Sequence, residues 1–508
     1  MNNLDYTLRK DWPLTDDQND IIDFMLHRAE CICAAQTGFG KTYLGCTAIC
    51  HILLKYQSSH AIILVPQKAI KAFKRELSEK LRVSYNTLTS DTFDFKENNR
   101  ITLMTHTSLK KYIDYIKDIK KSGKNLILLV DEAHIFSCKE SKIYQLMLSI
   151  RNYFSICYMM TATPLKNNIE GLFWLFTMLD YKIFGPWDFF KNNYLVTETH
   201  KTTRMCGRGN KKTKKTFYEE EVVGYKNLPM LKQILDKFII IKQKHYNLEF
   251  IYNKIELTPD EIKPYLNAGA GLLRATAKDS FAVRVHDLQQ VVDNINKDYK
   301  IIDKLSSKEQ LFIKLIYTKI KDNHPTLVYC DYNEVVDRLC YILDKTKNIT
   351  GVRQILQITG NISLKKRERV ENLIDNNTVV LITSAGTESV NLQKADSLIF
   401  YDIPFSILTF IQAVGRITRM DSKYNKQYIH ILEAVGTIDS YKRYLVQING
   451  GLIMNMFGKI ETLPLDVGQI DKNITRQLRH SLLWCFKQKR LLTEEELQNL
   501  ISITNKSN

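Results

Sequence analysis

Short, continuous apolar runs recur along the chain, and most are followed by turn residues and then by a pattern with helical spacing. Strands that are apolar throughout are buried on both faces, and such strands alternating with helices form parallel sheets. The runs fall into two series separated by a long stretch of different character, which predicts two α/β lobes. The first series lies at 31–35, 61–65, 101–105, 126–130 and 155–160, and the second at 326–330, 354–358, 379–383, 397–401 and 427–432.

The stretches outside these two series have another composition. Residues 165–300 are rich in aromatic residues, show helical spacing and contain a polar basic segment, and the end of the chain also has helical spacing. A chain of 508 residues is too long for one small module. We therefore expect a first lobe at 1–165, a helical protrusion and linker at 166–300 with a basic loop at 201–215, a second lobe at 301–440 and a helical segment at 441–508.

The segment AQTGFGKT at 35–42 follows the first apolar run and precedes a helical pattern. Gly38 and Gly40 let backbone N–H groups approach a phosphate, and a helix N-terminus adds partial positive charge. In such a turn Lys41 reaches the β- and γ-phosphates and the Thr42 hydroxyl binds Mg²⁺. A chance Gly-Lys-Thr turn lacks this strand–loop–helix context. We expect ATP and Mg²⁺ to bind here, with Thr37 in the same turn.

An acidic pair stands at the end of the apolar run 126–130, in the sequence DEAH at 131–134. Carboxylates at the C-terminal end of a buried parallel strand project into the ligand crevice. We expect Asp131 to hold Mg²⁺ and Glu132 to orient and deprotonate the attacking water. His134 is a candidate for coupling nucleotide state to the second lobe, as are Thr161 and Thr163 in TATP at 161–164, although a plain turn before the proline explains that motif equally well.

The second lobe contains QAVGRITR at 412–419, with helical spacing. Arg416 and Arg419 are three residues apart and would share a helix face. Two guanidinium groups on one face suit a γ-phosphate that is bound by the other lobe, as an arginine finger does. We expect Arg416, Arg419 and Gln412 to complete the catalytic site, whereas an isolated pair of this kind is more often a solvated basic face.

These motifs, in this order, resemble those of the superfamily 2 helicase-like ATPases, over about residues 10–440. Further segments resemble the Snf2 branch, and the resemblance implies two RecA-like lobes, with Gln18 in contact with adenine. It also implies that DNA crosses both lobes opposite the ATP side, with backbone contacts from Lys68, Thr105, His106, Ser108, Ser384 and Gly386. The Snf2-like segments are 65–76, 167–190, 238–242, 255–258, 360–367, 384–396 and 399–404.

The chain departs from the Snf2 pattern at a few positions. Thr387 and Ser389 stand where these proteins commonly carry glycines, Phe73 replaces a usual tryptophan, and the arginine motif lacks its usual ending. No chromatin-binding module is recognisable. The lack of such a module in a chain of this length favours a compact viral, phage or plasmid enzyme. No secretory signal and no paired metal-ligand cysteines are present, which favours a cytoplasmic location, in a host cell or a viral compartment, and excludes secretion.

The net charge of +17 predicts a polyanionic partner such as nucleic acid. Two segments without acidic residues, 201–215 and 472–490, hold 13 of these charges. The first has the composition of a flexible loop that grips phosphate or is merely solvated. The second either follows a duplex or packs Trp484 on the second lobe with its charges in water.

The motifs together indicate an ATP-dependent, Snf2-like translocase on nucleic acid, for which double-stranded DNA is the expected track. Two alternatives remain open from the sequence. One is a strand-separating or branch-migrating helicase on DNA or RNA, and the other is a transcription ATPase that works with a polymerase. The chain is expected to have no membrane association.

Overall fold

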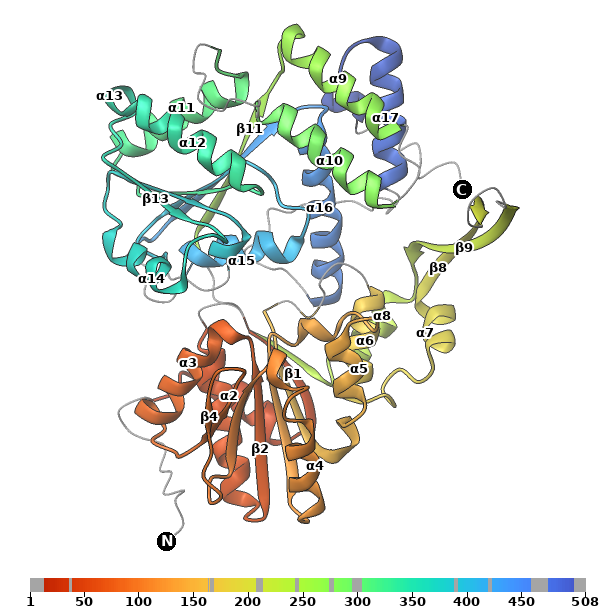
Figure 1. Ribbon diagram of the computed structural model, residues 1–508, viewed down its shortest axis with the longest axis vertical. Coiled ribbons are helices and arrows are strands. Elements are labelled where there is room, and N and C mark those ends of the chain that lie inside the picture. The colour runs from red at the N-terminus through yellow and green to blue at the C-terminus, as the bar shows by residue number, and fades with distance from the viewer. Residues whose placement is uncertain are drawn as a thin grey trace.

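A computed structural model gives the architecture shown in Figure 1. Two α/β lobes lie one above the other, and a thin two-stranded arm extends to one side. The structure describes residues 13–35, 39–162, 164, 169–206, 213–242, 246–273, 278–294, 304–387, 392–418, 423–457 and 474–497. No helix within these ranges is both long enough and apolar enough to cross a membrane.

The first lobe is built on an eight-stranded sheet with the order β10-β1-β7-β6-β2-β5-β3-β4. Every neighbouring pair is parallel except β3 and β4 at the edge. The strands are β1 (Glu30–Ala35), β2 (Ser59–Val65), β3 (Asn86–Leu88), β4 (Phe93–Asp94), β5 (Ile101–Thr105), β6 (Asn125–Asp131), β7 (Phe154–Met160) and β10 (Ile239–Lys242). The helices are α1 (Asp16–Leu26), α2 (Lys41–Lys55), α3 (Ile70–Arg75), α4 (Ile113–Lys121) and α5 (Lys142–Leu148).

The apolar strands of this lobe are buried on both faces, as predicted. Successive residues of β1 enter different cores: Ile32 belongs to one hydrophobic cluster, while Cys31 and Cys33 belong to another on the opposite face. Because side chains alternate across a strand, only an uninterrupted apolar run can fill two cores at once. The central strands are therefore mostly apolar up to their carboxyl-terminal ends, where the candidate site lies.

The second lobe is a six-stranded, fully parallel sheet with the order β11-β16-β15-β12-β14-β13. Its strands are β11 (Leu248–Ile255), β12 (Thr326–Tyr329), β13 (Gln354–Ile358), β14 (Thr378–Ile382), β15 (Ser397–Phe400) and β16 (Gln427–Ala434). Its helices are α11 (Ser307–Lys321), α12 (Asn333–Lys345), α13 (Lys347–Thr350), α14 (Leu364–Leu373) and α15 (Ile407–Ile417). All ten strands predicted from the apolar runs are present, which confirms the expected α/β class.

The segment between the lobes differs from the helical protrusion that we expected. It begins with helices α6 (Ile169–Leu179), α7 (Trp187–Tyr194) and α8 (Leu228–Leu235), but between α7 and α8 the chain forms the antiparallel strands β8 (Leu195–Cys206) and β9 (Thr213–Tyr225). The prediction of a flexible basic loop over 201–215 is therefore wrong for the residues described there. Threonine, valine and aromatic residues are frequent in 195–225, and these residue types favour strands.

The expected domain limits at 166 and 300 also need correction. β10 completes the sheet of the first lobe and β11 completes that of the second, so the boundary between the lobes lies between these two strands. Helices α9 (Pro259–Leu273) and α10 (Lys278–Val292) then pack with α16 (Ile438–Phe457) and α17 (Ile474–Gln488) in a helical layer on the second lobe. β10 has only four residues, and β11 mixes polar with apolar residues, so neither was recognised as a strand.

The second basic segment forms α17. Its apolar residues Leu478, Leu482 and Cys485 are buried in the helical layer, and Trp484 is partly buried against it. Arg490 lies over the Trp484 ring at 4.5 Å and pairs with Glu496. Lys487, Lys489 and Arg490 are exposed, which agrees, for these described cations, with the second of the two interpretations of residues 472–490.

A buried ionic cluster ties several elements of the second lobe together. The Lys308 ammonium group on α11 lies 2.8 Å from Asp293, 2.9 Å from Asp439 and 3.4 Å from Asp402, and all four side chains are completely buried. Gln289 donates to the same three carboxylates. These residues come from α10, α11, α16 and the loop after β15, so one cation joins four parts of the fold.

Candidate functional site

The phosphate-binding turn lies between β1 and α2. Gly40 has φ +89°, a backbone conformation that favours glycine, and a Cβ there would come within 3.1 Å of the Gln18 side-chain nitrogen. Gln18 Nε2 donates to the Phe39 carbonyl at 3.1 Å, so the residue expected at adenine rests against this turn. Among the described residues no side chain caps α2, which leaves its first N–H groups, including that of Thr42, suited to a phosphate. Thr37 and Gly38 lie outside the described residues.

The acidic pair stands where β6 ends, at the centre of the first lobe's sheet. Burial and the adjoining charge of Glu132 raise the pKa of Asp131 to about 7. Burial alone would raise the pKa of Glu132, but the hydrogen bond and charge of His134 and the charge of Lys41 lower it to about 2. The His134 Nδ1 atom lies 3.2 Å from Glu132 Oε2. His134 therefore has a direct partner in the acidic pair, and Glu132 stays ionised at neutral pH.

Glu132 has an unusual backbone conformation. Its φ of 52° and ψ of 48° place it in the left-handed region, which costs free energy for a residue other than glycine. The residue begins the short turn η4 (Ala133–Phe136), and this turn keeps the Glu132 carboxylate beside His134. Strained residues of this kind are concentrated at functional sites, which agrees with the role assigned to Glu132.

Lys41 lies at the first position of α2 and donates to the Ala35 carbonyl at 2.8 Å. Burial lowers its pKa, while the nearby carboxylates of Glu132 and Asp131 raise it and the charge of Arg416 lowers it. Arg416 belongs to the other lobe, on α15 at the face of the second lobe that is turned toward the first (Figure 1). The charges of the carboxylate pair and of an arginine from the other lobe thus all influence Lys41.

Arg416 and Gln412 lie one helical turn apart on α15, and each is only 6% exposed. The Arg416 Nε atom donates to the Gln412 carbonyl at 3.3 Å. α15 ends at Ile417 and Thr418 is extended, so the helical spacing that grouped Arg416 with Arg419 does not apply. Arg419 itself lies outside the described residues. The arginine that the structure brings to the site is therefore Arg416.

Two residues that were expected to contact nucleic acid interact electrostatically with the acidic pair. The charge of Lys68 lowers the pKa of both Asp131 and Glu132. Burial lowers the pKa of His106 to about 4, and its ring is influenced by the Asp131 backbone and by His134. The reason is the strand order β6-β2-β5, which brings the ends of these three strands together. Strand order cannot be read from the apolar runs alone.

Thr105 and Ser108 have a structural role that differs from the predicted nucleic-acid contact. Thr105 Oγ1 accepts from the Ser108 backbone at 3.2 Å, and Ser108 Oγ accepts from the Thr105 backbone at 3.0 Å. Ser108 Oγ also donates to the Leu88 carbonyl at 3.0 Å. Both residues are almost fully buried, so their hydroxyl groups close the turn η3 (His106–Ser108) and do not face a ligand.

Replacing Ser108 with alanine is expected to lower the free energy of unfolding by about 1–3 kcal/mol, because buried backbone groups would lose their partner. Nucleic-acid affinity should stay the same. The exposed Ser384 gives the matched variant, since Ser384→Ala should weaken nucleic-acid binding without loss of stability. Urea unfolding and a fluorescence binding titration measure the two effects. Weaker binding by Ser108→Ala at unchanged stability would contradict this assignment.

The remaining predicted residues occupy different environments. Ser384 begins the turn η6 (Ser384–Gly386), but Gly386 is buried, and a Cβ there would lie 2.8 Å from the Ile382 Cβ. Gly386 is therefore needed for close packing. Thr161 is fully buried and its backbone N–H donates to the Cys33 carbonyl at 3.1 Å, which links β7 to β1 below the phosphate-binding turn. Thr163 lies outside the described residues.

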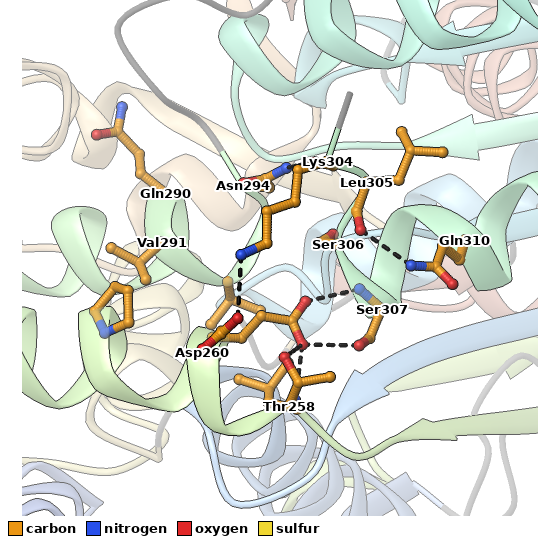
Figure 2. A pocket seen from close by; sticks show the side chains of 14 residues that line it. Thr258, Asp260, Gln290, Val291, Asn294, Lys304, Leu305, Ser306, Ser307 and Gln310 are labelled. Carbon is orange, nitrogen blue, oxygen red and sulfur yellow. Dashed lines mark hydrogen bonds and ion pairs between the residues drawn. The ribbon is translucent and has the colours of Figure 1, made fainter. Parts of the chain in front are cut away.

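A separate cavity of about 600 Å³ lies in the helical layer, away from the residues above (Figure 2). The Glu261 carboxylate accepts hydrogen bonds from the backbone and hydroxyl groups of both Thr258 and Ser307. It therefore satisfies donor groups at the starts of α9 and α11. Lys304 pairs with Asp260 across the opening at 3.2 Å. The cavity thus lies among the three helices α9, α10 and α11, and the ATPase motifs do not line it.

Comparison with known families agrees with this geometry. Residues 14–254 match the model of the SNF2-related domain, and residues 307–421 match that of the helicase conserved C-terminal domain. The two matches together cover more than half of the chain and correspond to the two lobes. The chain belongs to the SNF2-related helicase family. The resemblance drawn from the sequence is thereby confirmed.

Two relatives and one solved structure are similar to this chain. The CHD3-type chromatin-remodeling factor CHR7 of Arabidopsis thaliana is 23% identical over 432 residues, which are 80% of this chain and 34% of CHR7, so the chain spans about a third of that relative. A protein of Acanthamoeba polyphaga mimivirus named as an ATP-dependent RNA helicase, L538, is 27% identical over 421 residues, 80% of this chain and 85% of L538. The helicase MrfA, solved bound to DNA, has the same fold, with a TM-score of 0.50, 13% identity and coverage of 85% of this chain and 50% of MrfA.

Proposed function

We propose that this SNF2-related chain is an ATP-dependent translocase that moves along nucleic acid, with double-stranded DNA as its track. The observation that carries the proposal is that the charge of Arg416 on one lobe acts on Lys41 on the other, where Lys41 also interacts with Asp131 and Glu132. A site assembled from two bodies changes when they move, and hydrolysis of ATP can therefore drive their relative motion. The similarity to a chromatin-remodeling factor supports DNA as the polymer.

The residues of the site fit ATP and Mg²⁺. The uncapped start of α2 and the Lys41 ammonium group suit a triphosphate, and Thr42 with Asp131 would hold Mg²⁺, which neutralises phosphate charge when bound. The Glu132 carboxylate lies beside His134 and stays ionised, so it is able to accept a hydrogen bond from water. Glu132 would orient this water and accept its proton, and Arg416 would stabilise charge that develops on the γ-phosphate.

The experiment is an ATPase assay with no nucleic acid, single-stranded DNA, duplex DNA and duplex RNA at equal nucleotide concentration. A translocase on duplex DNA should be stimulated most by the DNA duplex and should displace a triplex-forming strand in the presence of ATP. Stimulation by RNA alone would overturn the choice of DNA. Absence of stimulation by every polymer would overturn the proposed function.

A second candidate function is a strand-separating RNA helicase, which the name of L538 supports. The two candidates differ in what they do to the polymer. Separation of a forked RNA duplex without displacement of a triplex-forming strand would favour the helicase. A copurification experiment with the polymerase of the source organism would test the further proposal of a transcription ATPase.

A further inference from the structure

The short segment between β15 and α15 leads into the helix that carries Arg416. The Asp402 carboxylate holds the beginning of this segment, because it accepts from the Asp331 backbone at 3.0 Å and lies in the buried cluster around Lys308. At the other end of the segment Phe405 is 40% exposed, and within the described residues no side-chain hydrogen bond caps α15. The position of the first turn of α15 therefore depends on the contacts of Phe405.

Lys442 on α16 contacts this segment from inside the fold. Its side chain is completely buried and pairs with Asp331 at 2.5 Å, in the turn after β12. Its ammonium group also lies 4.5 Å from the centre of the Phe405 ring and 5.8 Å from that of Tyr332. A cation is attracted to the face of an aromatic ring, and the attraction is stronger where water is excluded. One buried cation thus links Phe405 to the end of a central strand.

The helix α15 carries the position of its first turn to Arg416. Arg416 lies about 14 Å along the helix axis from Ile407, at the usual rise for each residue. The helix is held on the sheet by apolar packing, in which the Phe410 ring is stacked on that of Phe400 at 4.4 Å. Apolar packing is not directional, so it resists a shift along the axis less than a directed contact does. A shift of the first turn would therefore move Arg416.

The helix α16 also contacts the first lobe (Figure 1). It lies against α8, and Val446, one turn after Lys442, belongs to the hydrophobic cluster that contains Leu231 and Leu235 of α8. The helix that holds Phe405 is thus packed on both lobes. Its contacts relate the start of α15 to the lobe that carries the phosphate-binding turn.

We propose that Lys442 is a positioning residue for ATP hydrolysis, which holds Phe405 and the start of α15 so that Arg416 reaches the phosphates bound by the first lobe. The inference rests on the proposed function, in which Arg416 stabilises charge that develops on the γ-phosphate. Loss of the Lys442 contact is expected to slow hydrolysis and to leave ATP binding unchanged, because Arg416 acts on charge that forms only in the transition state.

The alternative is a structural ion pair between Lys442 and Asp331 that only stabilises the second lobe. Such a pair would affect the free energy of unfolding, and its effect on hydrolysis would not depend on Arg416. A positioning residue has the opposite properties. The two roles are therefore separated by kinetic constants and by the background in which each variant is measured.

The first variant is Phe405→Ala in the full chain, which removes the ring and leaves the pair of Lys442 with Asp331 in place. We expect the kcat of nucleic-acid-stimulated ATP hydrolysis to fall roughly fivefold to tenfold, a size that matches a desolvated contact between a cation and a ring, with KM for ATP unchanged. Phe405→Tyr keeps the ring and should keep the parent kcat. The matched control is Tyr317→Ala on α11, which removes an aromatic side chain of similar exposure, 46%, and should have no effect.

A second variant tests the cation itself. Lys442→Met/Asp331→Asn removes the ammonium group together with its carboxylate partner, so no buried charge is left without a partner in this pair. Its kcat should fall at least as much as that of Phe405→Ala, and thermal unfolding should show that the variant is folded. Parent-level kcat in this variant and in Phe405→Ala would overturn the inference.

The decisive comparison repeats Phe405→Ala in a chain that also carries Arg416→Ala, with single-turnover hydrolysis as the measurement. In this background Phe405→Ala should change the rate by less than about twofold, because the arginine through which it acts is absent. The same fold loss in both backgrounds would overturn the positioning role and leave the proposed function intact. Parent-level hydrolysis by Arg416→Ala alone would overturn the proposed site and the role of Lys442 together.

Discussion

Replacement of Glu132 with glutamine is expected to reduce nucleic-acid-stimulated ATP hydrolysis by roughly 100-fold or more, since loss of a general base typically has an effect of this size. The amide has the same shape as the carboxylate but cannot accept the proton of the attacking water. Glu132 stays ionised because His134 and Lys41 lower its pKa, so the native carboxylate is available across the neutral range. ATP affinity should change little. Steady-state hydrolysis and a nucleotide-binding titration measure the two quantities.

Two further variants show that the loss arises at this carboxylate. Glu97→Gln changes an exposed acidic residue in the same lobe and should keep full activity. Lys41→Ala should weaken ATP binding as well as hydrolysis, because Lys41 is the cation at the start of α2. Thermal unfolding should show that all three variants are folded. Parent-level hydrolysis by Glu132→Gln would refute the assigned mechanism.

The sequence predicted those parts of the fold that depend on local patterns. Ten strands were recognised because each contains a run of mostly apolar residues, which in the central strands fills two cores. Asp131, Glu132 and Lys41 were found because they lie at the ends of such elements. Local patterns thus identified the elements and the ATPase residues.

The parts that were missed depend on how elements meet in space. Lys68 and His106 lie beside the acidic pair because β2 and β5 follow β6 in the sheet, an order that differs from the order along the chain. Thr105 and Ser108 were expected to contact nucleic acid, but buried hydrogen bonds within their own turn satisfy them. The arm at 195–225 did have a local signal in its threonine and valine residues, and the high charge of 201–215 concealed it.

Lys308 was not singled out from the sequence, yet its loss should have the largest effect on stability. Burial alone would lower its pKa, but Asp293, Asp439 and Asp402 raise it, so the ammonium group remains charged inside the lobe. Lys308→Met would leave three carboxylates around an apolar side chain. Breaking a buried ion pair by removing one partner costs about 3–5 kcal/mol. The free energy of unfolding of the second lobe should therefore fall by at least about 3 kcal/mol.

Lys304 provides the control, because it pairs with Asp260 at 3.2 Å while both side chains are nearly 80% exposed. Lys304→Met should change the free energy of unfolding by no more than about 0.5 kcal/mol. Urea unfolding, with hydrogen exchange of peptides from α10, α11 and α16, locates the effect. The double variant Lys308→Met/Asp293→Asn should recover part of the loss, since it removes one of the carboxylates left without a cation. Equal losses for Lys308→Met and Lys304→Met, or strict additivity in the double variant, would show that the cluster does not hold the second lobe together.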